Sequence, residues 1–252
     1  MPTPQEPDFA PVPVRRVERD PQSALPDEHT WPRTIPAVAQ LIAEGLDLGR
    51  ATVLVGPNGS GKSTILEAVA MTYGLNAEGG CTGAMHRTRT TESDLAQWLR
   101  VVRGPGASRW GYFVRAETMH GLFSYLQDTN ELLERPVDPE FHRFSHGEAF
   151  VEVLASRRYQ GDGFFVWDEP EAGLSFEAQL HLLSELVEIA ARPGAQVLMA
   201  THSPVLAALP GAVVLECSEE GMRETAWDRL DMVDHYRRFL EAPERYLRHL
   251  RA

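Results

Sequence analysis

Residues 51–63 read Ala-Thr-Val-Leu-Val-Gly-Pro-Asn-Gly-Ser-Gly-Lys-Ser, and this stretch decides the fold of the chain. Its first five residues favour a β-strand, and its last eight fit the pattern G-x-x-x-x-G-K-[ST] at every position. Helical spacing of Ile65, Leu66 and Val69 follows directly. A strand, a glycine-rich loop and a helix in this order predict a P-loop, whereas a glycine-rich turn with a chance lysine would not need the flanking elements.

The predicted loop is suited to phosphate binding. Glycines let the backbone curl so that successive N–H groups face one anion, and the N-terminus of the next helix adds partial positive charge. Lys62 is placed to reach the β- and γ-phosphates of ATP, and the Ser63 hydroxyl is placed to bind Mg²⁺. The predicted nucleotide-binding residues of the loop are Gly56, Pro57, Asn58, Gly59, Ser60, Gly61, Lys62, Ser63 and Thr64.

A second chemical element follows a run of bulky apolar residues at 164–167, which predicts a buried strand. Asp168 and Glu169 come directly after it, at the strand end where open α/β sheets bind their ligands. Asp168 is the candidate Mg²⁺ ligand, and Glu169 is the candidate base that polarises an attacking water. The alternative is that the Asp-Glu pair only caps the next helix. Because a P-loop is also predicted, this structural role is the less favoured of the two.

Strands and helices alternate through most of the chain. Strands are predicted at 14–18, 51–55, 110–114, 164–167, 197–200 and 212–216, and helices at 36–44, 62–70, 120–127, 176–191 and 226–252. Leu180, Leu183 and Val187 mark the expected apolar stripe of the helix at 176–191. This alternation predicts an α/β fold with a mainly parallel central sheet covered by helices. Residues 1–13 are expected to be a proline-rich, disordered lead-in, and residues 14–252 one domain with a helical subdomain at about 118–160.

Composition excludes several classes of protein. Acidic residues number 36 and basic ones 24, so the formal net charge is −12, which argues against a protein that coats nucleic acid. The two cysteines, Cys81 and Cys217, are too far apart for a metal-binding pair and are consistent with a reducing compartment. No apolar run is long enough to span a membrane and no signal peptide is evident, so a cytoplasmic protein is expected.

Four elements together resemble a known family. The P-loop, Ser145-His146-Gly147-Glu148, the run from Asp168 to Ser175, and Thr201-His202-Ser203 appear in the order of an ABC-type ATPase. The chain is similar to the small stand-alone ATPases of the AAA/ABC-like group, relatives of SMC-like heads, from about Trp31 to its end. This resemblance implies a P-loop NTPase that hydrolyses ATP with Mg²⁺ and forms transient head-to-tail dimers.

The resemblance also implies roles for single residues. Ser145 and the backbone N–H of Gly147 stand in the signature motif, where they would contact ATP held by a second subunit, although His146 and Glu148 depart from the motif. His202 matches the switch histidine that senses the γ-phosphate, and Ser175 lies in the D-loop. Glu117 stands where the family carries a metal-sensing glutamine. The bland alternatives are an N-cap serine at 145 and a surface salt bridge at 117.

Several functions remain open. The favoured one is an ATP-driven switch that acts on an unknown protein partner; the alternatives are the ATPase subunit of a membrane transporter and a DNA repair or defence ATPase. A P-loop kinase would not need the motif at Ser145. The loop 76–91, with Arg87 and Arg89, could meet nucleic acid or simply be solvated, and Trp31 could stack on adenine or lie in the core.

Overall fold

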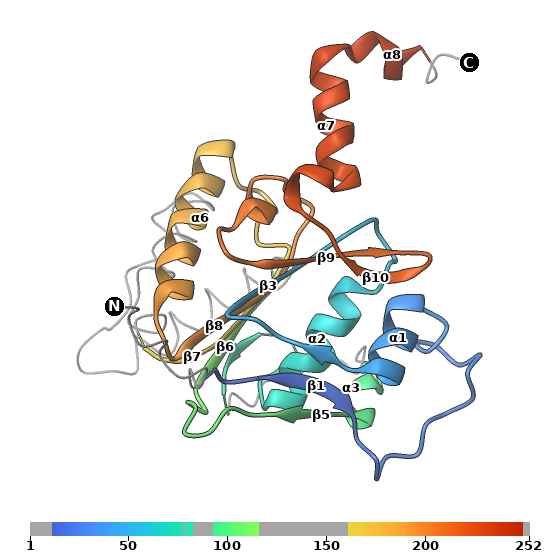
Figure 1. Ribbon diagram of the computed structural model, residues 1–252, viewed down its shortest axis with the longest axis vertical. Helices are drawn as coiled ribbons and strands as arrows, with labels where there is room; N and C mark the ends of the chain where they lie inside the picture. Colours follow the sequence, from blue (N-terminus) through green and yellow to red (C-terminus); the bar gives the residue numbers. More distant parts are fainter. Residues whose placement is uncertain (1–11, 78, 83–92, 116–160, 249–252) are drawn as a thin grey trace, which may run out of the picture.

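The computed structural model describes residues 12–77, 79–82, 93–115 and 161–248. Its centre is a seven-stranded sheet with the order β10-β9-β3-β8-β7-β6-β4 (Figure 1). The five inner strands are parallel, and the two edge strands are antiparallel to their neighbours. The strands are β3 (Ala51–Val55), β4 (Gly80–Cys81), β6 (Gly111–Arg115), β7 (Gly163–Asp168), β8 (Ala195–Ala200), β9 (Val213–Ser218) and β10 (Gly221–Glu224). The predicted parallel α/β sheet is therefore confirmed.

Helices cover both faces of this sheet. Helix α6 (Phe176–Ala191) lies on one face, and α1 (Pro36–Glu44) and α2 (Lys62–Tyr73) lie on the other (Figure 1). Successive side chains of a strand point to opposite faces. Phe165 and Trp167 of β7 accordingly join the core beneath α6, and Phe164 and Val166 join the core beneath α1 and α2. Burial on both faces explains why the inner strands are continuous apolar runs.

The helices at 36–44 and 176–191 match their predicted bounds, but the expected stripe of α6 is only partly right: Leu183 and Val187 pack against the core and Leu180 does not. Leu180 is 44% exposed, and Leu183 and Val187 are only partly buried. The buried residues of α6 are Leu182, Leu186 and Ile189. Both sets fit the helical period, because this helix is apolar around more than half of its circumference. Contact with β8 selects the second set for full burial.

A small antiparallel sheet lies beside the main one. It has the order β2-β1-β5 and consists of β1 (Arg16–Arg19), β2 (Leu46–Asp47) and β5 (Leu99–Val102), with the short helix α3 (Leu95–Trp98) before β5. The expected strand at 14–18 is thus confirmed in outline, two residues later, but its partners were not expected. Buried Gln196 of β8 joins the segment before β1 to the main sheet: its amide pairs with the N–H and C=O of Val14 at 2.8 and 2.7 Å and donates to Gly49 O at 2.8 Å.

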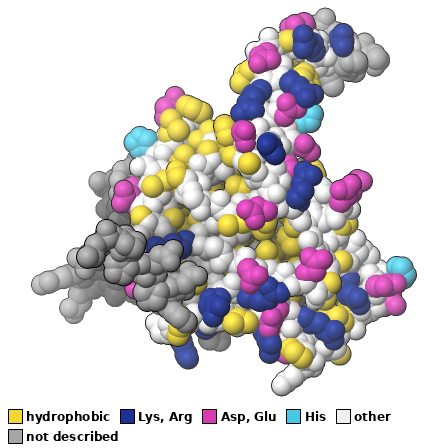
Figure 2. Space-filling model, viewed as in Figure 1, with side chains coloured by type: hydrophobic (Ala, Val, Ile, Leu, Met, Phe, Trp, Pro, Cys, Tyr) yellow, Lys and Arg dark blue, Asp and Glu magenta, His cyan; other side chains and the backbone are white. Residues whose placement is uncertain are grey.

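The C-terminal segment projects from the body (Figure 1). After the 3₁₀ turns η4 (Leu206–Ala208) and η5 (Trp227–Arg229), it forms α7 (Asp231–Glu241) and α8 (Pro243–Leu247). The predicted helical tail is therefore confirmed from 231 to 247, with a break at Ala242. Figure 2 shows charged side chains of both signs along this projection and apolar side chains on the body beside it. None of the helices in the described ranges is both long and apolar enough to cross a membrane. The expected helix at 120–127 and the helical subdomain at 118–160 lie outside those ranges.

We expect Gln196→Leu to lower the free energy of unfolding by about 3 kcal/mol, because three backbone groups, two of them buried, then lose their hydrogen-bond partner. Urea unfolding followed by circular dichroism measures this change. Gln22→Leu is the matched control, since Gln22 is exposed and its side chain has no comparable contacts. Equal effects of the two substitutions would contradict the role assigned to Gln196.

Candidate nucleotide-binding site

The P-loop lies between the C-terminal end of β3 and the first turn of α2, as the sequence predicts. Gly56 and Gly61 adopt φ angles of 138° and 96°, which residues other than glycine rarely adopt. A Cβ atom at Gly56 would lie 2.3 Å from the carbonyl oxygen of Cys217, and one at Gly61 would lie 2.7 Å from Ile35. Glycine is therefore required at both positions by neighbouring chain segments as well as by the backbone conformation.

Lys62 is the first residue of α2 and the only lysine in the sequence. Its side chain is buried, and its ammonium donates to the carbonyl oxygens of Gly56 and Pro57, both at 2.9 Å. Burial lowers the pKa of Lys62, and the nearby acidic groups, Glu169 and Asp168 among them, oppose this shift. These contacts hold the charge at the centre of the loop, beside the N–H groups at the start of the helix.

The loop fits a phosphate group on two further observations. The Ser60 hydroxyl is buried and has no hydrogen-bond partner among the described residues. Buried polar atoms normally have a partner, so this hydroxyl is available to a bound ligand. Burial also raises the pKa of Cys217, behind the loop, to about 11, so this thiol is uncharged at neutral pH and does not repel an anion.

Ser63 and Asp168 meet as expected for a Mg²⁺ site. The Ser63 hydroxyl donates to Asp168 Oδ1 at 2.9 Å, although the two residues lie 105 positions apart. Hydroxyl and carboxylate oxygens are ligands that Mg²⁺ prefers, and the ion takes its other ligands from nucleotide phosphates and water. The Ser63 and Asp168 oxygens therefore fit an ion that is bound together with a nucleotide. Within the described ranges no cluster of three or more His, Cys, Asp or Glu side chains is arranged to hold a metal.

Two consecutive carboxylates have different surroundings. The Asp168 side chain is 7% exposed and bonded, whereas the Glu169 side chain is 44% exposed. Glu169 is the only non-glycine residue of the described segments with a positive φ, 50°, and its N–H donates to Ala200 O at 2.9 Å. This left-handed conformation at the end of β7 turns its side chain away from the strand. The sequence placed the two residues together, and the structure separates a buried carboxylate from an accessible one.

His202, for which the resemblance implies a switch role, lies beside Glu169. Its Nε2 is 3.3 Å from Glu169 Oε1, and this approach does not form a hydrogen bond. The His202 N–H donates to Glu171 Oε1 at 2.5 Å. The next residue, Ser203, donates from its hydroxyl to Gln179 of α6 at 2.6 Å. Glu171 and Gln179 thus anchor the loop that carries His202.

Sequence reasoning did not assign any role to Glu171, Gln179, Glu67 or Arg115. Arg115 ends β6; it pairs with Glu67 of α2 at 2.7 Å and lies 3.5 Å from Asp168. The sequence did hold a signal for this contact, because Arg115 lies at the end of a predicted strand and therefore at the same sheet edge as Asp168. In that segment only Glu117 was considered as a metal ligand. Ser145, Gly147, Glu117, Arg87 and Arg89 lie outside the described residues. Trp31 is 56% exposed, so the core position considered for it is wrong.

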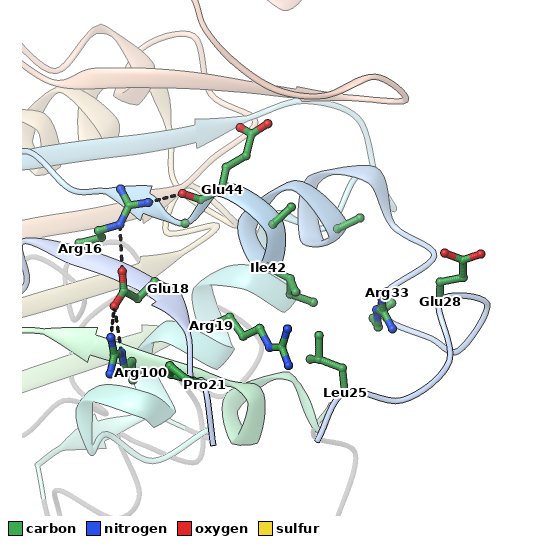
Figure 3. Close-up of a pocket in the computed structure, with 13 residues that line it drawn as sticks. Arg16, Glu18, Arg19, Pro21, Leu25, Glu28, Arg33, Ile42, Glu44 and Arg100 are labelled. Atoms are coloured by element: carbon green, nitrogen blue, oxygen red, sulfur yellow. Dashed lines mark hydrogen bonds and ion pairs between the residues drawn. The ribbon is translucent and has the colours of Figure 1, made fainter. Parts of the chain in front are cut away.

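A separate pocket of about 650 Å³ lies between β1, α1 and the segment before α1 (Figure 3). Glu18 at its wall pairs with Arg16 at 3.2 Å and with Arg100 at 2.6 Å, and Arg16 also pairs with Asp47 at 2.7 Å. Arg16 further donates to the backbone carbonyl of Glu44. These pairs join β1, β2 and β5, so we assign this ion-pair group to the small sheet and not to the nucleotide site.

The site geometry defines a P-loop ATPase, and comparison with known families specifies its kind. The model of the ABC transporter family matches residues 42–172, and a family described as an AAA domain with the AbiEii toxin of a type IV TA system matches residues 149–208. The first match covers more than half of the sequence. This chain therefore belongs to the ABC transporter family as an ATP-binding, ABC-type ATPase.

Curated relatives share this assignment. The cytochrome c biogenesis ATP-binding export protein CcmA of Rhizobium meliloti is 30% identical over 65% of this chain and 83% of its own length. The iron(3+)-hydroxamate import ATP-binding protein FhuC of Bacillus subtilis is 25% identical over 65% of this chain and 68% of its length. The zinc import ATP-binding protein ZnuC of Vibrio parahaemolyticus is 25% identical over 64% of this chain, which spans only 60% of that relative.

Solved structures with some likeness include a metal-chelate type ABC transporter in an inward-facing conformation, with a TM-score of 0.44 and 16% identity over 86% of this chain and 84% of that one. The SMC head domain from Thermotoga maritima gives a TM-score of 0.41 and 14% identity over 72% of this chain and 93% of that one.

We expect Lys62→Ala to weaken ATP binding by about 3 kcal/mol, roughly 100-fold, because charge-assisted contacts to the phosphates are lost. Isothermal titration calorimetry with Mg-ATP measures the affinity. Arg50→Ala is the control: it removes an exposed cation at the opposite end of β3 and should bind ATP normally. Parental affinity of Lys62→Ala would show that the loop does not bind phosphate.

Glu169→Gln and Asp168→Asn should separate chemistry from metal-dependent binding. Glu169→Gln is expected to bind Mg-ATP normally and to turn over at least about 100-fold more slowly, because the accessible carboxylate is lost. Asp168→Asn should instead raise the Mg²⁺ concentration needed for ATP binding. Calorimetry and a phosphate-release assay measure the two properties, with Glu188→Gln on the exposed side of α6 as control. The same profile for both site variants would contradict these separate roles.

Proposed function

We propose that this protein is a Mg²⁺-dependent ATPase in which ATP draws two copies together head to tail, and that this cycle acts as a switch on a partner protein. The observation that carries the proposal is the convergence of three segments at one sheet edge. Lys62 and Ser63 begin α2, Asp168 ends β7 and is followed by Glu169, and His202 lies shortly after β8. The contacts from Ser63 to Asp168 and from Glu169 to His202 join all three segments.

In this proposal each side chain of the site has a separate role in hydrolysis, which its surroundings determine. Lys62 and the backbone N–H groups of the loop bind the β- and γ-phosphates. Ser63 and buried Asp168 hold Mg²⁺, which supplies charge neutralisation of the phosphates when it is bound. Glu169 is open to solvent and orients a water toward the γ-phosphate. His202 donates to the γ-phosphate, and Glu171 fixes the position of its backbone.

The pairing of two copies is supported by the segment after Glu169. Residues 172, 173, 175 and 176 are all exposed, and Phe176 has 60% of its surface open. A large apolar side chain so close to the site is suited to contact with another chain. The resemblance supplies the other half of the proposal, in which Ser145 and Gly147 of the second copy close the open side of the γ-phosphate. A two-fold arrangement then makes two equivalent sites.

The ATP-binding subunit of a membrane transporter is a second candidate, favoured by the relatives, whose names describe import and export ATP-binding proteins. The two candidates differ in the partner that the ATP-bound state retains. Affinity capture with Glu169→Gln, with and without ATP, from separate membrane and soluble fractions distinguishes them. ATP-dependent capture of an integral membrane protein supports the transporter subunit, and ATP-dependent capture of a soluble protein supports the switch.

Two inactive variants should complement each other if each site is shared. Lys62→Ala damages the P-loop side and Ser145→Arg damages the opposite side, so a mixed dimer carries one intact site and one doubly damaged site. Mixing equal amounts should restore phosphate release to about a quarter of the parental rate, since half of the dimers are mixed and each has one good site.

Subunit exchange is verified by mixing tagged and untagged chains before the assay. Mixtures of Lys62→Ala with Glu169→Gln are the negative control, because both changes lie on the same side of a site and no intact site can form. No recovery despite exchange would exclude shared sites, and full activity of Ser145→Arg alone would exclude a role for the signature segment.

A further inference from the structure

Arg115 places a permanent positive charge beside Asp168, the candidate metal ligand. Arg115 and Asp168 are paired residues in the register of β6 and β7, at the C-terminal ends of both strands. Arg115 Nε lies 3.5 Å from Asp168 Oδ2, while Ser63 donates to the other carboxylate oxygen, Oδ1. The Arg115 side chain is 20% exposed. Both oxygens of the proposed Mg²⁺ ligand are therefore engaged by groups of this chain.

Glu67 provides a second carboxylate for the same guanidinium. Arg115 Nη1 lies 2.7 Å from Glu67 Oε2 and also donates to Ala77 O at 3.2 Å. Glu67 lies one helical turn after Ser63 on α2, so the two side chains share a face of that helix. The closer of the two ion pairs is the one with Glu67. Arg115 can thus move away from Asp168 and still keep a charge-assisted partner.

We propose that Arg115 competes with Mg²⁺ for Asp168, and that Glu67 holds the guanidinium when the ion binds, so that the pair sets the Mg²⁺ concentration at which ATP is retained. This inference rests on the proposed function, because it concerns the same metal position. A cation of one charge and an ion of two charges repel each other when they share one carboxylate. Arg115 is a positioning residue in this proposal and takes no part in bond making.

The proposal predicts opposite effects for the two partners of the ion pair. Arg115→Met keeps the apolar stem but removes the competing charge, so the Mg²⁺ concentration for half-maximal ATP binding should fall about tenfold. Glu67→Gln leaves the guanidinium with a weaker alternative to Asp168, so the same concentration should rise about threefold. Arg115→Lys keeps a charge without the planar fork and should lie between parental protein and Arg115→Met.

The measurement is binding of a fluorescent ATP analogue to the full chain over a series of Mg²⁺ concentrations, with binding in EDTA as the metal-free reference. A double-mutant cycle separates competition from a general field effect. If Glu67 acts through Arg115, Glu67→Gln has no further effect when Arg115 is already Met; if both act only as remote charges, the two effects add. Arg103→Met is the control, since Arg103 contacts α2 through Tyr73 O and not through a carboxylate.

The outcomes are distinct. The proposal is supported if the Mg²⁺ concentration for half-maximal binding falls with Arg115→Met, rises with Glu67→Gln and changes non-additively in the double variant. It is overturned if this concentration shifts in the same direction in both variants, if the two shifts add, or if neither variant shifts it while its circular dichroism is unchanged. If Arg115→Met does not fold, Arg115→Lys and Glu67→Gln still decide by the sign of their shifts. Parental protein that binds the analogue equally well at every Mg²⁺ concentration would overturn the metal role in the proposed function, and this inference with it.

Discussion

The hydrogen bond between Ser63 and Asp168 is the contact on which the site depends, because it joins the helix after the P-loop to a strand that is not adjacent to β3. Strand β8 lies between β3 and β7, and its pairing with both fixes the distance between their C-terminal ends. Parallel strands align their carboxyl ends at one sheet edge. Hydrophobic cores on both faces of the sheet exclude water from the inner strands. Gln196 of β8 holds the N-terminal segment against the sheet by its hydrogen bonds to Val14. The sheet therefore sets the relative positions of the site residues.

One four-residue run, Asp168-Glu169-Pro170-Glu171, supplies three carboxylates with three different environments. Asp168 is still part of the strand and remains buried, whereas Glu169 leaves it with a left-handed backbone and is accessible. Glu171 turns back to accept the backbone N–H of His202. A single turn thus positions the proposed metal ligand, the proposed base and the support of the switch loop. A change in that turn would disturb all three at once, which local substitutions of the carboxylates alone would not.

Strong local signals made the main features predictable. The P-loop pattern, the apolar run before Asp168 and the helix at 176–191 all lie where the sequence indicates, because each follows from consecutive residues. Features set by pairing of distant segments were not predictable. Strand β1 pairs with β5, whose residues lie 80 or more positions later in the sequence. Arg115 meets Glu67 and Asp168 only after three elements are assembled. The buried face of α6 was predicted only in part for a related reason, since the helix is apolar over a wide arc and contact with the sheet selects which of its apolar residues are fully buried. Composition could not reveal that Trp31 is exposed, because tryptophan is frequent both in cores and in binding sites.

The charge balance of the site explains why metal and nucleotide are expected to bind together. Among the described residues, the carboxylates of Glu67, Asp168, Glu169 and Glu171 lie near two cations, Lys62 and Arg115, in a protein whose net charge is −12. A triphosphate alone adds negative charge to an acidic sheet edge, and Mg²⁺ alone meets an aspartate that is already paired with Arg115. Each ligand offsets the charge that opposes the other, so their affinities are linked and the linkage is reciprocal. The free energy of this coupling depends on how firmly Arg115 is held, which places part of the control of nucleotide binding on Glu67, a residue of the helix and not of the loop.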